Sequence, residues 1–62
     1  MNYETILKNI DDVNQRLAHE YNRWSTSNES YIIDECIWII QGLEKRLNNL
    51  YIQAKKQGTT QA

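Results

Sequence analysis

The sequence predicts an all-α protein built as a two-helix antiparallel hairpin, and three observations support this prediction. The chain of 62 residues has no proline and only two glycines, a composition that favours long uninterrupted helices. Apolar residues recur with a seven-residue period in two stretches, residues 3–24 and 28–56. A polar segment rich in helix-capping residue types joins the two patterns, and so short a connection folds two helices back on each other.

The first helix is expected over residues 3–24, with Asn2 as its N-cap. Heptads counted from Tyr3 place apolar side chains at the core positions a and d until Glu20 occupies a d position. Glu20 is either a buried polar residue that helps to specify the pairing or a side chain that reaches solvent past Tyr21. Charges of alternating sign at every fourth residue predict a solvated face on this helix: Glu4, Lys8, Asp12, Arg16 and Glu20.

The second helix is expected over residues 28–56 and has the clearest periodicity in the chain. Its a and d positions hold Ile33, Cys36, Ile40, Leu43, Leu47, Leu50 and Ala54. The stretch 31–40 is rich in β-branched and aromatic residues and could be read as strands, but the register that continues through Leu50 favours a helix. Gly42 marks either a close approach of another chain segment or a weak point in this helix.

The ends of the second helix carry their own signals. Thr26 and Glu29 have the spacing of a capping box at its start, with Ser27 and Asn28 as rival caps. Gly58 is read as a helix stop. We therefore expect one hairpin domain over residues 1–57 and a disordered tail over residues 58–62.

The second helix carries more apolar residues than one partner helix can cover. Beyond the core positions, the f line of the heptad and its neighbours are also apolar, and a contiguous apolar surface of this kind predicts an interface. The alternative is that an oblique helix crossing widens a single core. The interface residues predicted in this way are Tyr31, Ile32, Trp38, Ile39 and Ile52.

Composition excludes several classes of function. Seven basic and eight acidic residues give a formal charge of −1, which argues against bulk electrostatic capture of nucleic acid. One cysteine and one histidine cannot form a closed zinc site, and no motif of an enzyme or a cofactor-binding site is present. We read His19 as a surface residue and Cys36 as a core residue, and we expect no enzyme, no metal and no cofactor. A single thiol and the lack of signal-peptide and membrane-spanning patterns favour the cytoplasm.

The basic residues of the second helix gather in its second half. They are Lys45, Arg46, Lys55 and Lys56, and a hairpin would bring Lys8 to the same end. Glu4 and Glu44 dilute this charge. The four residues form a candidate nucleic-acid patch, which is the weaker of the two surfaces that the sequence predicts.

Length and hairpin layout over residues 3–56 resemble Rop, a plasmid-encoded RNA-binding regulator in which two hairpins form an antiparallel four-helix bundle. The layout is also similar to the small helical-hairpin co-chaperones of type III secretion needle subunits. Neither resemblance includes a residue motif, so no functional position is transferred to this sequence. What the resemblance implies is a compact accessory protein of the phage or plasmid type that works without a cofactor.

Because a chain of this length buries little core by itself, oligomerisation is a common source of further stability. The sequence therefore predicts a non-enzymatic interaction or regulatory module that pairs as a homodimeric four-helix bundle and binds a protein partner. Two alternatives stay open: a Rop-like RNA- or DNA-binding regulator that uses its basic end, and a small co-chaperone that folds against a helical partner.

Overall fold

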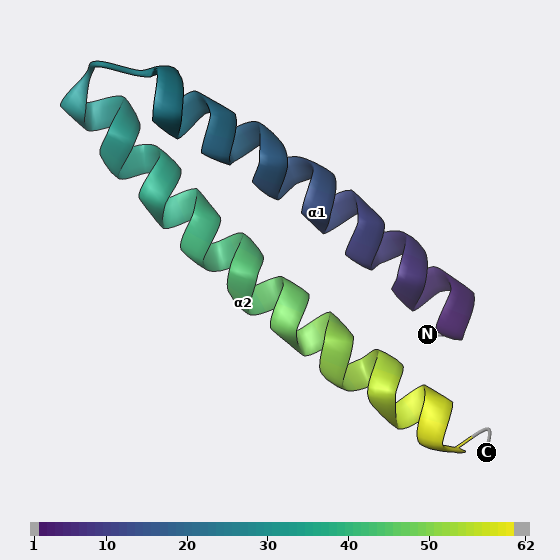
Figure 1. Ribbon diagram of the computed structural model, residues 1–62. Coiled ribbons are helices and arrows are strands. Elements are labelled where there is room, and N and C mark those ends of the chain that lie inside the picture. The colour runs from purple at the N-terminus through teal and green to yellow at the C-terminus, as the bar shows by residue number, and fades with distance from the viewer. Residues whose placement is uncertain (1, 61–62) are drawn as a thin grey trace.

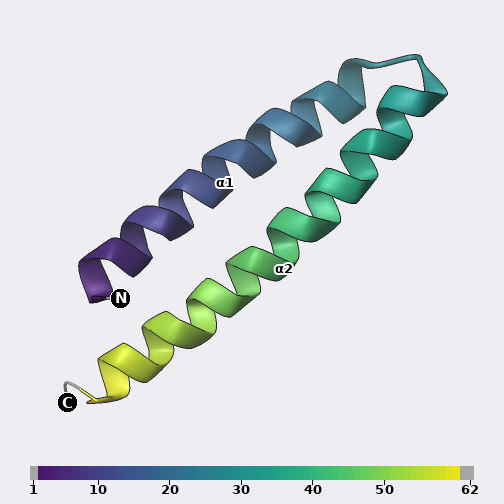
Figure 2. The ribbon, with the colours of Figure 1, turned by 180° about the vertical axis from the view of Figure 1, so that it is seen from behind.

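The computed structural model describes residues 2–60 and contains two helices, α1 (Tyr3–Thr26) and α2 (Ser30–Thr60). The helices run antiparallel, and residues 27–29 connect them at one end (Figures 1 and 2). The molecule is a rod of 49 × 14 × 14 Å. The predicted all-α hairpin is therefore confirmed.

The core is a single seam between the two helices. All of its buried apolar residues occupy predicted a and d positions, which confirms the heptad register: Ile6, Ile10, Val13, Leu17, Cys36, Ile40, Leu43 and Leu50. Leu47 and Ala54 pack against this seam with half-buried side chains. Cys36 has no exposed surface, as expected for a core cysteine.

The start of α1 is capped as the sequence predicts. The Asn2 side-chain Oδ1 accepts a hydrogen bond from the backbone N–H of Thr5 at 2.8 Å, and the Asn2 carbonyl accepts one from Ile6 at 3.1 Å. Asn2 itself has an extended backbone conformation, as an N-cap requires. Glu4 places a negative charge in the first turn, where the helix dipole favours it.

The connection differs from the predicted capping box. α1 continues to Thr26, whose hydroxyl donates to the carbonyl of Asn22 at 2.8 Å. A threonine inside a helix can form this hydrogen bond to a carbonyl of the preceding turn. The Thr26 hydroxyl is therefore used within α1 and does not cap α2. The start of α2 is set instead by Glu29, whose carbonyl accepts the N–H groups of Ile32 and Ile33, each at 3.1 Å.

The end of α2 also differs from the prediction. The helix passes through Gly58 and ends at Thr60, so residues 58–60 are helical, whereas residues 61–62 lie outside the described part of the chain. A glycine ends a helix when it adopts a positive φ, and neither glycine of this chain does so. Without that conformation, and with no proline behind it, Gly58 only weakens the last turn.

Gly42 lies in the interior of α2 with its Cα exposed to solvent. A Cβ atom built at this position would meet no other heavy atom within 4 Å. Its φ is negative like that of any helical residue. Of the two interpretations of Gly42, the structure favours the weak point over the close approach.

We therefore predict that Gly42→Ala stabilises the protein by about 1 kcal/mol, because alanine loses less backbone entropy than glycine when a helix interior forms. Urea unfolding followed by circular dichroism measures this change. Gly58→Ala is the matched control and should have a smaller effect, because the last turn of a helix frays. Destabilisation by Gly42→Ala would show that something approaches this position.

Candidate interaction surface

The large exposed apolar side chains divide into two surfaces according to their heptad positions. The first surface, here called the two-helix face, combines residues of both helices at e positions or at the exposed ends of the a line. It consists of Tyr3, Leu7, Tyr21 and Trp24 from α1 and Ile37 and Tyr51 from α2. In an antiparallel helix pair, the e positions of both helices lie on the same side of the seam. These six residues therefore share one side of the hairpin.

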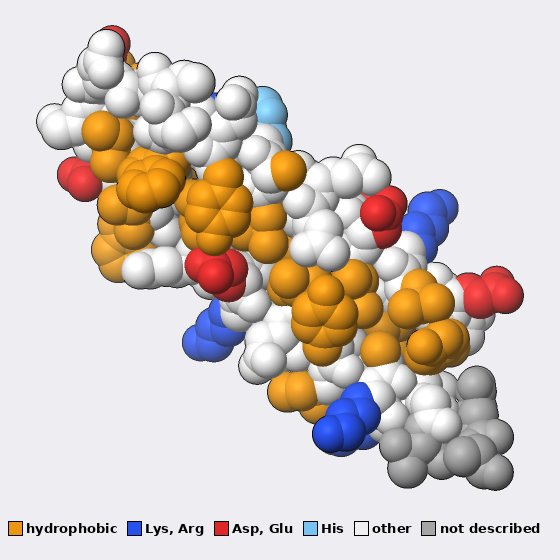
Figure 3. All heavy atoms as spheres, viewed as in Figure 1, with side chains coloured by type: hydrophobic (Ala, Val, Ile, Leu, Met, Phe, Trp, Pro, Cys, Tyr) orange, Lys and Arg blue, Asp and Glu red, His pale blue; other side chains and the backbone are white. Residues whose placement is uncertain are grey.

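The two-helix face is hollowed near the turn. Tyr21 and Trp24 of α1 and Ile37 of α2 stand around an open hollow, together with Ile40, Gln41 and Glu44. In Figure 3, apolar side chains gather over both helices on the side shown, in one group toward the turn and another toward the termini. A polar interval separates the groups, as expected from Asn14 and Glu44 at the middle e positions.

The second surface, here called the outer line, follows the f positions of α2. Trp38 is 75% exposed, Tyr31 67% and Ile52 46%. An f position points away from the seam, so these side chains lie on the outer edge of the rod and not on the two-helix face. The outer line therefore consists of three of the five residues that the sequence analysis predicted to form an interface.

The remaining two predicted interface residues are placed differently by the structure. Ile32 and Ile39 occupy g positions and pack against the core with half-buried side chains. Both side chains are therefore only partly exposed, and their part in an interface stays a prediction. They widen the core, which is the alternative that the sequence had left open.

The opposite side of the hairpin is polar. An open hollow there is lined mainly by α1, with Asp12, Arg16, His19 and Glu20 among its residues, and Arg46 of α2 borders it. His19 is exposed, as expected. Acidic and basic side chains both line this hollow, so its electrostatic potential is not dominated by either sign.

The four basic residues of the predicted nucleic-acid patch are all exposed but do not share a face. At about 100° per residue, Lys45 and Lys56 point outward, while Arg46 and Lys55 point to opposite sides of α2. Arg46 stands beside the mixed charges of the polar hollow. Binding of nucleic acid through these residues stays a prediction.

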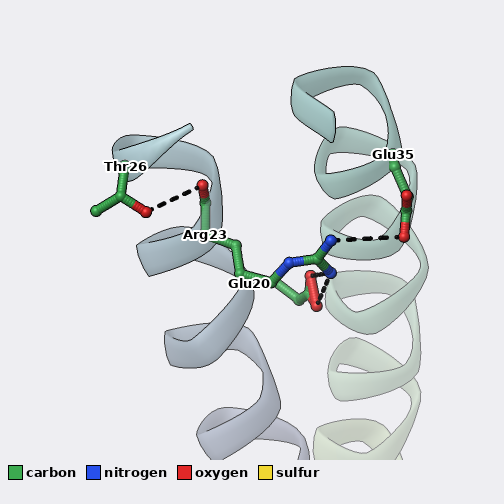
Figure 4. A network of polar contacts seen from close by, with 4 residues as sticks. All are labelled: Glu20, Arg23, Thr26 and Glu35. Atoms are coloured by element: carbon green, nitrogen blue, oxygen red, sulfur yellow. Dashed lines mark hydrogen bonds and ion pairs between the residues drawn. The ribbon is translucent and has the colours of Figure 1, made fainter. Parts of the chain in front are cut away.

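An ionic network near the turn, centred on the buried Glu20, reaches from α1 to α2. Glu20 is only 7% exposed, and both of its carboxylate oxygens accept hydrogen bonds from Nη1 of Arg23 at 3.0 Å. Nη2 of the same guanidinium lies 3.6 Å from Oε1 of Glu35 on α2 (Figure 4). Arg23 thus neutralises the buried acid and reaches across to α2.

Two pKa values report the electrostatics of this end. The pKa of Arg23 is raised, first by its hydrogen bond to Glu20 and then by the charge of that carboxylate. The pKa of the Tyr31 hydroxyl is raised, chiefly by hydrogen bonding to Glu29 and less by partial desolvation. Arg23 is therefore held in its charged form and Tyr31 in its neutral form, and Glu20 is the buried polar residue that the sequence offered as one alternative.

The described residues contain no group of three or more His, Cys, Asp or Glu side chains arranged to hold a metal ion. Within residues 2–60, neither helix has a stretch long and apolar enough to cross a membrane. Comparison with protein-family models, curated proteins and solved structures gives no match for this chain.

The sequence analysis did not single out the two-helix face, although Leu7, Tyr21, Ile37 and Tyr51 fall at e positions of the same heptads. The available signal was a contrast between positions e and g. The e positions of both helices hold these four apolar residues, whereas three of the g positions hold arginine: Arg16, Arg23 and Arg46. Combining the e positions of both helices would have located the face.

We predict that Arg23→Ala lowers the urea midpoint of unfolding by more than Glu35→Ala, because only the first change leaves the Glu20 carboxylate buried without its partner. Glu35 is exposed, and exposed ion pairs contribute little. The double variant Glu20→Leu with Arg23→Ala should regain the lost stability, since no buried charge then remains. Equal shifts for Arg23→Ala and Glu35→Ala would contradict this account of the network.

Proposed function

We propose that the chain is a non-enzymatic interaction module that pairs with a second copy through the two-helix face and binds a protein partner through the outer line. The observation that carries the proposal is the spread of exposed aromatic and aliphatic residues over both helices on one side of the rod. Groups of exposed apolar side chains of this kind are typical of protein interfaces. Tyrosine and tryptophan, which supply four of its six residues, are frequent interface anchors.

The small core supports self-association. In the part of the chain that the structure describes, only eight apolar residues are buried, all of them along a single seam. A chain of about 60 residues is marginal on such a core, and a second copy is a common way to bury more apolar surface. Stacking two hairpins through the two-helix face gives a four-helix bundle, in which a twofold axis uses the same surface of both copies.

The outer line supports the second half of the proposal. Its f positions lie at the edge of the rod, so a copy stacked on the two-helix face would leave Tyr31 and Trp38 uncovered. A hydrophobic groove or helix of a protein partner is the chemistry that such an aromatic edge fits. Regulation by this module would then consist of bringing two partner molecules together.

We predict that the wild-type protein sediments as a dimer at micromolar concentration and that Ile37→Lys weakens the dimer at least tenfold, because lysine would place a charge in the apolar contact. Trp38→Lys is the matched control: the neighbouring residue lies on the outer line, so the dimer should persist. Circular dichroism at the same concentrations separates dissociation from unfolding. A well-folded wild-type monomer, or a dimer that Trp38→Lys disrupts and Ile37→Lys does not, would contradict the proposal.

A further inference from the structure

The two-helix face has a regular internal spacing that limits how two copies can stack. Its e positions read Leu7, Asn14 and Tyr21 on α1, and Ile37, Glu44 and Tyr51 on α2. On each helix, a polar residue lies seven residues, or about two helical turns, from an apolar residue on either side. Asn14 and Glu44 are both exposed, and Figure 3 shows the polar interval between the apolar groups.

A twofold axis can stack two such hairpins face to face in two ways. With both turns at the same end, α1 of one copy lies over α2 of the other. With the turns at opposite ends, α1 lies over α1 and α2 over α2. Because the polar interval is central, both arrangements can bring apolar groups onto apolar groups.

The polar residues at the middle e positions, Asn14 and Glu44, distinguish the two arrangements. With the turns at opposite ends, Glu44 faces Glu44 of the other copy across an apolar interface, where two carboxylates repel each other. With the turns together, each Glu44 faces Asn14 of the other copy. The carboxamide N–H of Asn14 can then donate a hydrogen bond to the Glu44 carboxylate. The two Glu44 carboxylates then lie diagonally across the four-helix bundle and no longer face each other.

The charges at the margins of the two-helix face do not separate the two arrangements. The α1 margin is acidic near the termini, with exposed Glu4 and Asp11 at b positions, and becomes neutral toward the turn. The corresponding b positions of α2 near the termini are Asn48 and Lys55. With the turns together, Glu4 faces Lys55 of the other copy, whereas with the turns at opposite ends the exposed Asp34, at the b position of α2 near the turn, faces that lysine. Each arrangement therefore forms two such pairs, and the choice between them rests on Asn14 and Glu44.

We propose that two copies stack through the two-helix face with their turns at the same end of the bundle. This inference rests on the proposed self-association and specifies its geometry. Each copy's α1 packs on the other copy's α2, and the Asn14–Glu44 layer fixes the lengthwise alignment. Polar residues in an otherwise apolar interface are well suited to such a role, because they penalise the competing arrangement.

A spin label at the turn tests the orientation directly. Asn28→Cys places a single exposed attachment point in the connection, and Cys36, which has no exposed surface, should not take up the label. Unsubstituted protein treated with the label is the control; if Cys36 reacts, the measurement is repeated with Cys36→Ala. Double electron–electron resonance then gives the distance between the labels of the two copies.

We expect one short distance, on the scale of two stacked rods that are each 14 Å wide. A long distance that approaches the 49 Å length of the rod would overturn the proposed orientation and leave self-association intact. The absence of any dipolar coupling, together with sedimentation as a monomer, would overturn both the orientation and the proposed self-association. Circular dichroism of the labelled protein confirms that the substitution leaves the helices formed.

Discussion

The structure depends on one geometric constraint: a hairpin of two helices has a single seam, and each helix can bury only the side that faces the other. The a and d positions fill that seam, and the half-buried Ile32 and Ile39 extend it on one side. Apolar residues anywhere else stay on the surface, however many there are. The exposure of Trp24, Ile37 and Tyr51 is therefore a consequence of having only two helices.

The ionic network near the turn is the polar counterpart of this seam. Glu20 occupies a core d position, where an apolar residue would extend the seam toward the turn. Arg23 keeps the carboxylate neutralised and lies 3.6 Å from Glu35 on α2, so an ionic contact takes the place of apolar packing at this core position. A buried ionic network of this kind favours the correct pairing of the two helices more than it stabilises the fold. The cost of removing the charges from water offsets much of their attraction.

The sequence predicted the fold and the core well because a seven-residue period is a strong signal over a long helix. It failed where local signals competed. Thr26 could cap α2 or bond back into α1, and Gly58 could end a helix or be carried through one, and the composition around each residue does not decide between them. It placed Trp38 correctly outside the seam, but the two-helix face depends on which e and g positions two antiparallel helices bring together, a relation between segments that no single stretch contains.

The central claim is that a second copy covers the two-helix face and leaves the outer line open. Acrylamide quenching of fluorescence in two single-tryptophan variants measures this coverage as protein concentration rises. With Trp38→Phe, the remaining Trp24 should become shielded as dimers form, because it lies on the two-helix face. With Trp24→Phe, the remaining Trp38 should stay accessible throughout. Trp24 that stays equally accessible at every concentration, or shielding of Trp38 in its place, would contradict the claim.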